Sequence, residues 1–146
     1  MVDKKLKKLG GIDDVTAPLV GGNLAILLSS LKTPWEVQTK GKILFIEDVG
    51  ERAYRVDRML FQLRMAGKLD DLKGVVVGDF TDCREPNKKE LWPEVIRRHF
   101  KDAGYPVIMG LKSGHGDVCL PLPLGVECRI STRRNPIFEV IGGYAL

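Results

Sequence analysis

The chain has 146 residues, of which 44% are hydrophobic and 29% charged, and its formal net charge is +4. These values fit one globular domain and exclude a disordered or collagen-like chain. The longest apolar run, residues 24–28, is far shorter than the roughly 20 residues of a membrane-spanning helix. No signal-peptide core follows the N-terminal lysines. We therefore expect a cytoplasmic protein with no membrane partner.

The basic residues do not form a nucleic-acid-binding pattern. The first eight residues hold four lysines and one aspartate, which account for most of the net charge of +4. The remaining basic doublets are scattered and lack interleaved aromatic residues, so they indicate solvated surfaces. Three cysteines without CxxC spacing predict buried, reduced and inert thiols. These cysteines are Cys83, Cys119 and Cys128.

The first predicted elements follow a lead-in segment. Residues 1–20 have turn-rich sequence with little apolar periodicity, and we interpret them as a lead-in or linker to a domain spanning 21–146. Asn23 is a candidate N-cap for a short helix that carries leucines on one face and ends before Pro34. Residues 42–46 then form an apolar run typical of a buried central strand.

The middle of the chain predicts a strand–helix–strand unit. Apolar residues recur at helical spacing until Gly67, and a second buried strand follows at 75–77. This order favours parallel strands with a right-handed crossover. A helix over 91–100 and a strand over 106–109 come next. The C-terminal third holds three short strand-like runs, interpreted as a β-meander, at 117–122, 126–131 and 137–141.

Two acidic residues end the first buried strand of this α/β chain. Glu47 and Asp48 lie at the carboxyl end of the strand, the edge at which ligands bind in α/β sheets. Consecutive strand residues point to opposite faces, so at most one of the two carboxylates can face a given site. Glu47 is the better candidate, against the alternative that it caps a neighbouring helix.

His115 is the candidate base because it lies between two glycines directly after a predicted strand. A carboxylate and a histidine on neighbouring strand ends suggest a base and the group that orients it. A local triad of Ser113, His115 and Asp117 is disfavoured, because such near neighbours cannot converge in the required order. No serine lies in a G-x-S-x-G elbow, so a nucleophile is missing. The other histidine, His99, is interpreted as a boundary residue of a helix, and no metal-ligand spacing is present.

Five short motifs in register resemble the C-terminal domain of the LD-carboxypeptidases, or muramoyltetrapeptide carboxypeptidases, and of the related microcin-immunity peptidases. The resemblance runs from about Gly10 to Ile141. Residues 31–35 depart from the pattern, because they read Leu-Lys-Thr-Pro-Trp where the family is closer to Gly-Thr-Pro-Tyr, and substrate preference is open for that reason. The motifs are Gly21–Leu24, Lys42–Val49, Asp57–Leu60, Gly114–His115 and Leu122–Gly125.

The resemblance implies a swivelling β/β/α-type domain of a serine peptidase. Glu47 and His115 would be the acid and base of a Ser-His-Glu triad whose serine lies in an N-terminal nucleophile domain, which is absent here, so the chain alone is expected to be inactive. The implied reaction removes the terminal D-alanine from cytoplasmic murein tetrapeptides during peptidoglycan recycling, without a metal or cofactor. Asn23 and Asp48 would lie next to the substrate cleft, although capping is an equal alternative.

The implied partners are the N-terminal domain and a murein peptide. The face that meets that domain should carry an apolar patch, through which the isolated chain could form a homodimer. Two alternatives remain at this point: a non-catalytic peptide-binding module with the same fold, and half of a microcin-type peptide–nucleotide hydrolase.

Overall fold

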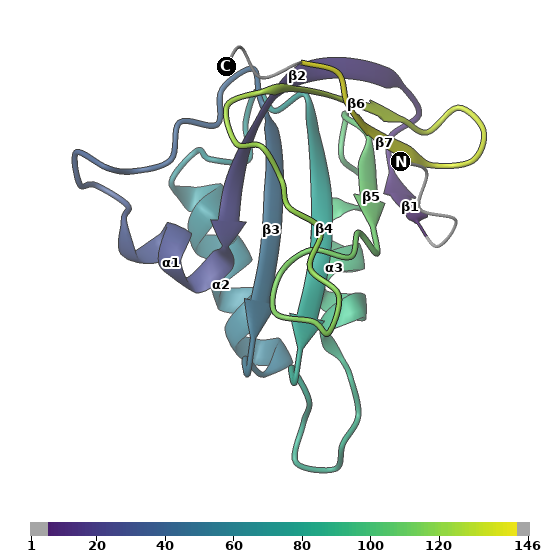
Figure 1. Cartoon of the computed structure of the whole chain (residues 1–146). Coiled ribbons are helices and arrows are strands. Elements are labelled where there is room, and N and C mark those ends of the chain that lie inside the picture. Colours follow the sequence, from purple (N-terminus) through teal and green to yellow (C-terminus); the bar gives the residue numbers. More distant parts are fainter. Residues whose placement is uncertain (1–5, 143–146) are drawn as a thin grey trace.

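The computed structural model describes residues 6–142. Its sheet has the strand order β1-β5-β4-β3-β2-β6-β7, with the three helices packed on one side (Figure 1). The elements in chain order are β1 (Lys7–Gly10), β2 (Asp14–Asn23), α1 (Leu24–Ser29), β3 (Ile43–Val49), α2 (Ala53–Met65), β4 (Gly74–Thr81), α3 (Trp92–Phe100), β5 (Val107–Met109), β6 (Glu127–Ser131) and β7 (Ile137–Val140). No helix in the described part is long and apolar enough to span a membrane.

The centre of the sheet is parallel, and the predicted βαβ unit is confirmed. Strand β3 pairs in parallel with both β2 and β4, and β4 pairs in parallel with β5. The helix α2 crosses between β3 and β4 and buries Val56, Leu60 and Leu63 against them. Strands buried on both faces need a continuous apolar sequence, which is why β3 and β4 were recognisable in the sequence.

Alternate residues of β3 belong to two different hydrophobic layers. Leu44 and Ile46 pack under the helices, whereas Ile43 and Phe45 pack in a second cluster on the other face. Residues of β6 and β7 join this second cluster, so the sheet curls over its own helix-free face. The domain is therefore a curled α/β sheet with helices outside, and the β-rich C-terminal third is confirmed at 127–131 and 137–140.

The segment interpreted as a lead-in or linker, residues 1–20, contributes strand β1 and most of strand β2 to the sheet. The first half of β2 pairs with β6 in antiparallel fashion, and its second half, from Leu19, pairs with β3 in parallel. Pro18 lies where β2 changes partner, and this position tolerates the missing N–H. Strand β1 also lies in this segment and pairs with β5. Lys4 and Lys5 of the predicted lead-in lie outside the described residues.

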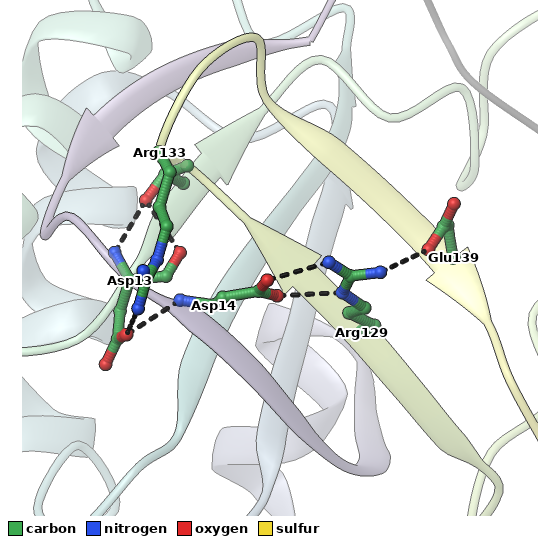
Figure 2. A network of polar contacts seen from close by, with 6 residues as sticks. Asp13, Asp14, Arg129, Arg133 and Glu139 are labelled. Atoms are coloured by element: carbon green, nitrogen blue, oxygen red, sulfur yellow. Dashed lines mark hydrogen bonds and ion pairs between the residues drawn. The ribbon is translucent and has the colours of Figure 1, made fainter.

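A polar network joins the start of β2 to the C-terminal strands (Figure 2). Arg129 of β6 donates two hydrogen bonds to Asp14, with N···O distances of 2.8 and 2.7 Å, and lies 3.5 Å from Glu139 of β7. Arg133 lies 3.6 Å from Asp13. The bidentate pair adds a directional side-chain contact to the backbone ladder between β2 and β6.

The predicted strand at 117–122 is wrong. This segment is an irregular loop between β5 and β6, and Figure 1 shows the connection crossing in front of β3 and β4. The Leu120 N–H donates to the Lys112 carbonyl at 2.8 Å, which closes a loop instead of extending a ladder. Pro121 and Pro123 lack the N–H groups that a strand would need. The consequence is a loop that carries His115 over the sheet.

Candidate active site

His115 and Glu47 meet although they lie far apart in the sequence. The His115 Nδ1 atom lies 2.7 Å from Glu47 Oε2. The histidine ring is 52% exposed, whereas the carboxylate is 6% exposed. The pair predicted from strand-end positions therefore forms at the carboxyl end of β3, with the acid buried and the ring facing outward.

The strand β3 separates the two adjacent acids as its pleat requires. Glu47 follows Phe45 on the helix-free face and contacts His115. Asp48 follows Ile46 on the helix face, where Oδ2 accepts a hydrogen bond from the Ala25 N–H at 3.1 Å. The expectation that only one carboxylate can face the site is confirmed.

Glycines on both sides of His115 make the close approach possible. Gly114 has φ of +127°, and a Cβ there would lie 2.7 Å from Glu47 Oε2. A Cβ on Gly116 would lie 2.7 Å from the Asp79 carboxylate. Neither position accepts a side chain without displacing an acid, so the loop rests with bare backbone on two carboxylates.

The hydrogen bond determines which ring nitrogen carries the proton. An ionised carboxylate only accepts hydrogen bonds, so His115 Nδ1 donates to Glu47 and Nε2 of the neutral ring is the acceptor. The Glu47 hydrogen bond and its charge hold the pKa of His115 above the usual 6.5, with a smaller contribution from Asp48. In the described residues, Nε2 has no hydrogen-bond partner. The ring is thus a basic acceptor open to an incoming hydroxyl.

A hollow of about 280 Å³ surrounds this pair. It contains one serine, Ser113, whose Oγ donates to the Leu120 carbonyl at 2.9 Å instead of to His115. The disfavoured local triad accordingly does not form among these residues. The lining residues are Gly21, Gly22, Phe45, Glu47, Ser113, Gly114, His115, Cys119, Leu120, Pro121, Leu122 and Leu124.

Cys119 corrects the expectation of three buried thiols. It is exposed and lines the hollow, whereas Cys83 and Cys128 are buried. Burial raises the pKa of both buried thiols to about 11, so they stay protonated. Cys119 was missed because its place beside His115 depends on the irregular loop, which had been predicted as a strand.

Asn23 and Asp48 lie together at the start of α1. The Asn23 amide donates to Asp48 Oδ1 at 3.1 Å, and its Oδ1 accepts from the Ile26 N–H at 3.1 Å. The predicted N-cap is confirmed. Both residues are engaged in organising the β2–α1 junction, and their role in substrate binding stays a prediction.

A larger hollow, of about 640 Å³, lies beside His99 at the α2–α3 contact. His99 Nε2 lies 2.8 Å from Asp57 Oδ1, which also accepts from Arg98 at 2.9 Å. Asp57 thus pairs with two of the charged or titratable side chains that line this hollow. Among residues 6–142, no group of three or more His, Cys, Asp or Glu side chains is placed to hold a metal ion.

Comparisons with known proteins identify relatives of this chain. The sequence model of the LD-carboxypeptidase C-terminal domain matches residues 16–130. The probable murein peptide carboxypeptidase of Bacillus subtilis is 44% identical over 117 residues, covering 78% of this chain and 36% of the relative. The murein tetrapeptide carboxypeptidase of Pseudomonas aeruginosa is 33% identical over 113 residues, or 76% of this chain and 37% of the relative.

Solved structures share the fold as well. The muramoyltetrapeptide carboxypeptidase of Oxalobacter formigenes has a TM-score of 0.81 and 32% identity, covering 95% of this chain and 50% of that one. The microcin C7 self immunity protein MccF has a TM-score of 0.76 and 26% identity, covering 94% and 41%. The chain thus spans at most half the length of these relatives. Because the matched segment is most of its sequence, the chain belongs to the LD-carboxypeptidase C-terminal domain family.

Proposed function

We propose that this chain supplies the base and the orienting acid of a serine carboxypeptidase that removes the terminal D-alanine from murein tetrapeptides in the cytoplasm. The observation that carries the proposal is the 2.7 Å contact between His115 Nδ1 and a buried Glu47, with Nε2 facing outward. A buried acid that fixes the ring, and a ring nitrogen open to solvent, are the requirements for a base that serves an external nucleophile.

In this mechanism, His115 Nε2 accepts the proton of the nucleophilic serine as that serine attacks the scissile carbonyl. His115 then returns the proton to the leaving amine of D-alanine. Glu47 keeps the proton on Nδ1 throughout and stabilises the imidazolium that forms between the two steps. No metal or organic cofactor takes part.

The serine would come from a companion N-terminal domain. Two observations support this division. Among residues 6–142, the hollow around His115 holds no serine available to Nε2, and the chain covers 36–37% of two murein peptide carboxypeptidases. The leucines that line the hollow, with Leu124 exposed, offer apolar area for the companion to cover. The isolated chain is then inactive, and its exposed apolar face favours a homodimer.

A second candidate substrate is a peptide–nucleotide conjugate. Structures of the microcin C7 self immunity protein contain aspartyl sulfamoyl adenosine, and that protein shares the fold at a TM-score of 0.76. Among the solved structures, the identity is higher to the muramoyltetrapeptide carboxypeptidase, 32% against 26% for MccF, which favours the murein substrate.

The test is a chimera in which this chain replaces the matching C-terminal segment of the Bacillus subtilis relative. D-alanine release from murein tetrapeptide is measured for this chain alone, for the chimera and for the chimera with His115→Ala. We expect release by the chimera only. A parallel assay with aspartyl sulfamoyl adenosine distinguishes the two substrates.

Each other outcome is informative. Release by the chain alone would mean that it holds its own nucleophile, and the division between domains would be wrong. Undiminished release with His115→Ala would remove His115 from the mechanism. A folded chimera that is silent on both substrates would favour a peptide-binding module.

A further inference from the structure

A charged pair outside the proposed triad lies directly under the His115 loop. Strand β4 carries an extra residue opposite Glu47: Ile46 pairs with Val77 and Asp48 with Phe80, so Gly78 and Asp79 together face one residue of β3. Such a bulge redirects the extra side chain. Here it brings Asp79 under the loop, while Phe80 returns to the core beneath the helices.

The Asp79 carboxylate is held from one side only. Its Oδ1 accepts a hydrogen bond from Lys112 Nζ at 2.9 Å, and the Asp79 side chain is 14% exposed. Its Oδ2 is buried and has no hydrogen-bond partner among the described residues. Gly116 covers this oxygen, since a Cβ on that glycine would lie 2.7 Å from it.

The same two residues close the base of the loop through their backbones. The Asp79 N–H donates to the Ser113 carbonyl at 3.0 Å, and the Lys112 carbonyl accepts from the Leu120 N–H at 2.8 Å. Loop, strand end and ion pair therefore form one unit. His115 stands between its two contact points, with Gly114 on Glu47 and Gly116 on Asp79.

Glycines on both sides leave the His115 backbone free to adopt many conformations, so the sequence next to His115 does not fix its ring. We propose that Asp79 and Lys112 are positioning residues: their ion pair clamps the Gly114–Gly116 segment so that His115 Nδ1 stays on Glu47. Neither residue touches the reacting atoms. The inference rests on the proposed function only in treating His115 as the base.

Titration of the histidine rings by NMR tests the clamp without any peptidase assay. His99 and His115 are the two histidines of the chain, so His99 serves as an internal reference. The variant is Lys112→Met, which removes the ion pair at a half-exposed side chain and keeps much of the aliphatic stem. We expect the His115 pKa to fall by about 0.5, a threefold change in the protonation equilibrium, because the Glu47 contact is populated less.

The sign separates positioning from simple electrostatics. Removing the positive charge of Lys112 would raise the His115 pKa if that charge acted only through space, whereas losing the clamp lowers it. Lys112→Arg is the matched control and should restore the wild-type value, because it keeps a cation on Asp79. Asp79→Ala also removes a negative charge, so both explanations predict a lower His115 pKa for it, and the decision rests on Lys112→Met.

A His115 pKa that rises or stays unchanged in Lys112→Met, with the His99 titration intact, would overturn the proposal. So would a Lys112→Arg variant that behaves like Lys112→Met. Because these measurements use the chain alone, they remain decisive even if the chimera releases no D-alanine, and the two proposals fail separately.

Discussion

This protein has two histidine–carboxylate pairs with almost equal contact distances but opposite exposure of the ring and the acid. His115 lies 2.7 Å from Glu47, and His99 lies 2.8 Å from Asp57. In the first pair the ring is 52% exposed and the acid 6%, whereas in the second the ring is 10% exposed and the acid 42%. The distance alone does not tell the two pairs apart.

The difference teaches that the exposed partner decides what a pair can do. A buried acid holds an exposed ring by one nitrogen and leaves the other nitrogen without a partner among the described residues, as in His115. A buried ring tied to an exposed acid joins two elements, and Asp57 of α2 indeed also accepts a hydrogen bond from Arg98 of α3. The larger hollow lies beside His99, which belongs to the pair whose ring is buried.

The largest expected difference between the two pairs is their contribution to catalysis. In the chimera, His115→Ala should lower kcat/KM by about 10⁴-fold or more, since a triad without its base retains little beyond binding. His99→Ala should leave kcat/KM close to the parent value, because that ring faces α2. Steady-state kinetics on murein tetrapeptide measures both. Equal losses of kcat/KM in the two variants would show that the two histidines do not differ in catalysis.

The two carboxylates, Glu47 and Asp57, should also differ in their contribution to kcat. Glu47→Gln is expected to reduce kcat by about 10³–10⁴-fold with little change in KM, because an amide can hold the wrong tautomer of His115. The matched change Asp57→Asn should spare kcat. If Glu47→Gln keeps the parent kcat while His115 still contacts residue 47, the carboxylate is dispensable for the reaction.

The pH dependence follows from the raised pKa of His115. The ring acts as a base only when Nε2 is free, so kcat/KM of the chimera should rise with pH around a midpoint above the ordinary histidine value of 6.5. Glu47→Gln should move the midpoint of any residual activity to lower pH, because the carboxylate that raises the pKa is gone. A midpoint below 6.5 in the parent would contradict the pairing.

The smallest effect concerns stability. Asp57→Ala should lower the free energy of unfolding by about 1 kcal/mol at pH 7, because it removes charge-assisted bonds from a partly exposed acid. The His99 hydrogen bond lowers the Asp57 pKa below 3.8, so this contribution exists above that pH and disappears as the pH falls through the lowered value. Urea unfolding measures the free energy of unfolding of the parent, of Asp57→Ala and of an Asp102→Ala control, both at pH 7 and at a pH below the lowered Asp57 pKa.

Much of the centre of the fold could be predicted because local pattern and environment agree there. Residues 43–46 are apolar on both faces of the sheet, and Glu47 and Asp48 follow the pleat to opposite sides. The pleat alone predicts that at most one of these two carboxylates can face a given site, and the structure places Glu47 and Asp48 on opposite faces. His115 was a candidate because two glycines flank it directly after a predicted strand, where they let the backbone bend and expose the ring. The structure adds that the same glycines lie against Glu47 and Asp79.

The remaining features depend on contacts that the local sequence does not encode. Strand β2 carries Pro18, Gly21 and Gly22, which are typical of turns, and it becomes a strand through pairing with β3 and β6. Residues 117–122 form a short strand-like run in the sequence, but they pair with no strand among the described residues. The position of Asp79 follows from a bulge in β4, and nothing in an apolar run marks where an extra residue will be accommodated.

The two-partner strand β2 also has a consequence for how the chain folds. Its contact with β6 joins residues 115 apart in sequence, as between Asp14 and Arg129. Closing so long a loop early is entropically unfavourable, so the local β3–α2–β4 unit should form first and the β6–β7 hairpin should dock last. Weakening the Asp14–Arg129 contact should therefore accelerate unfolding more than it slows folding. The pairing of β2 with β6 is therefore expected to be the last step of folding.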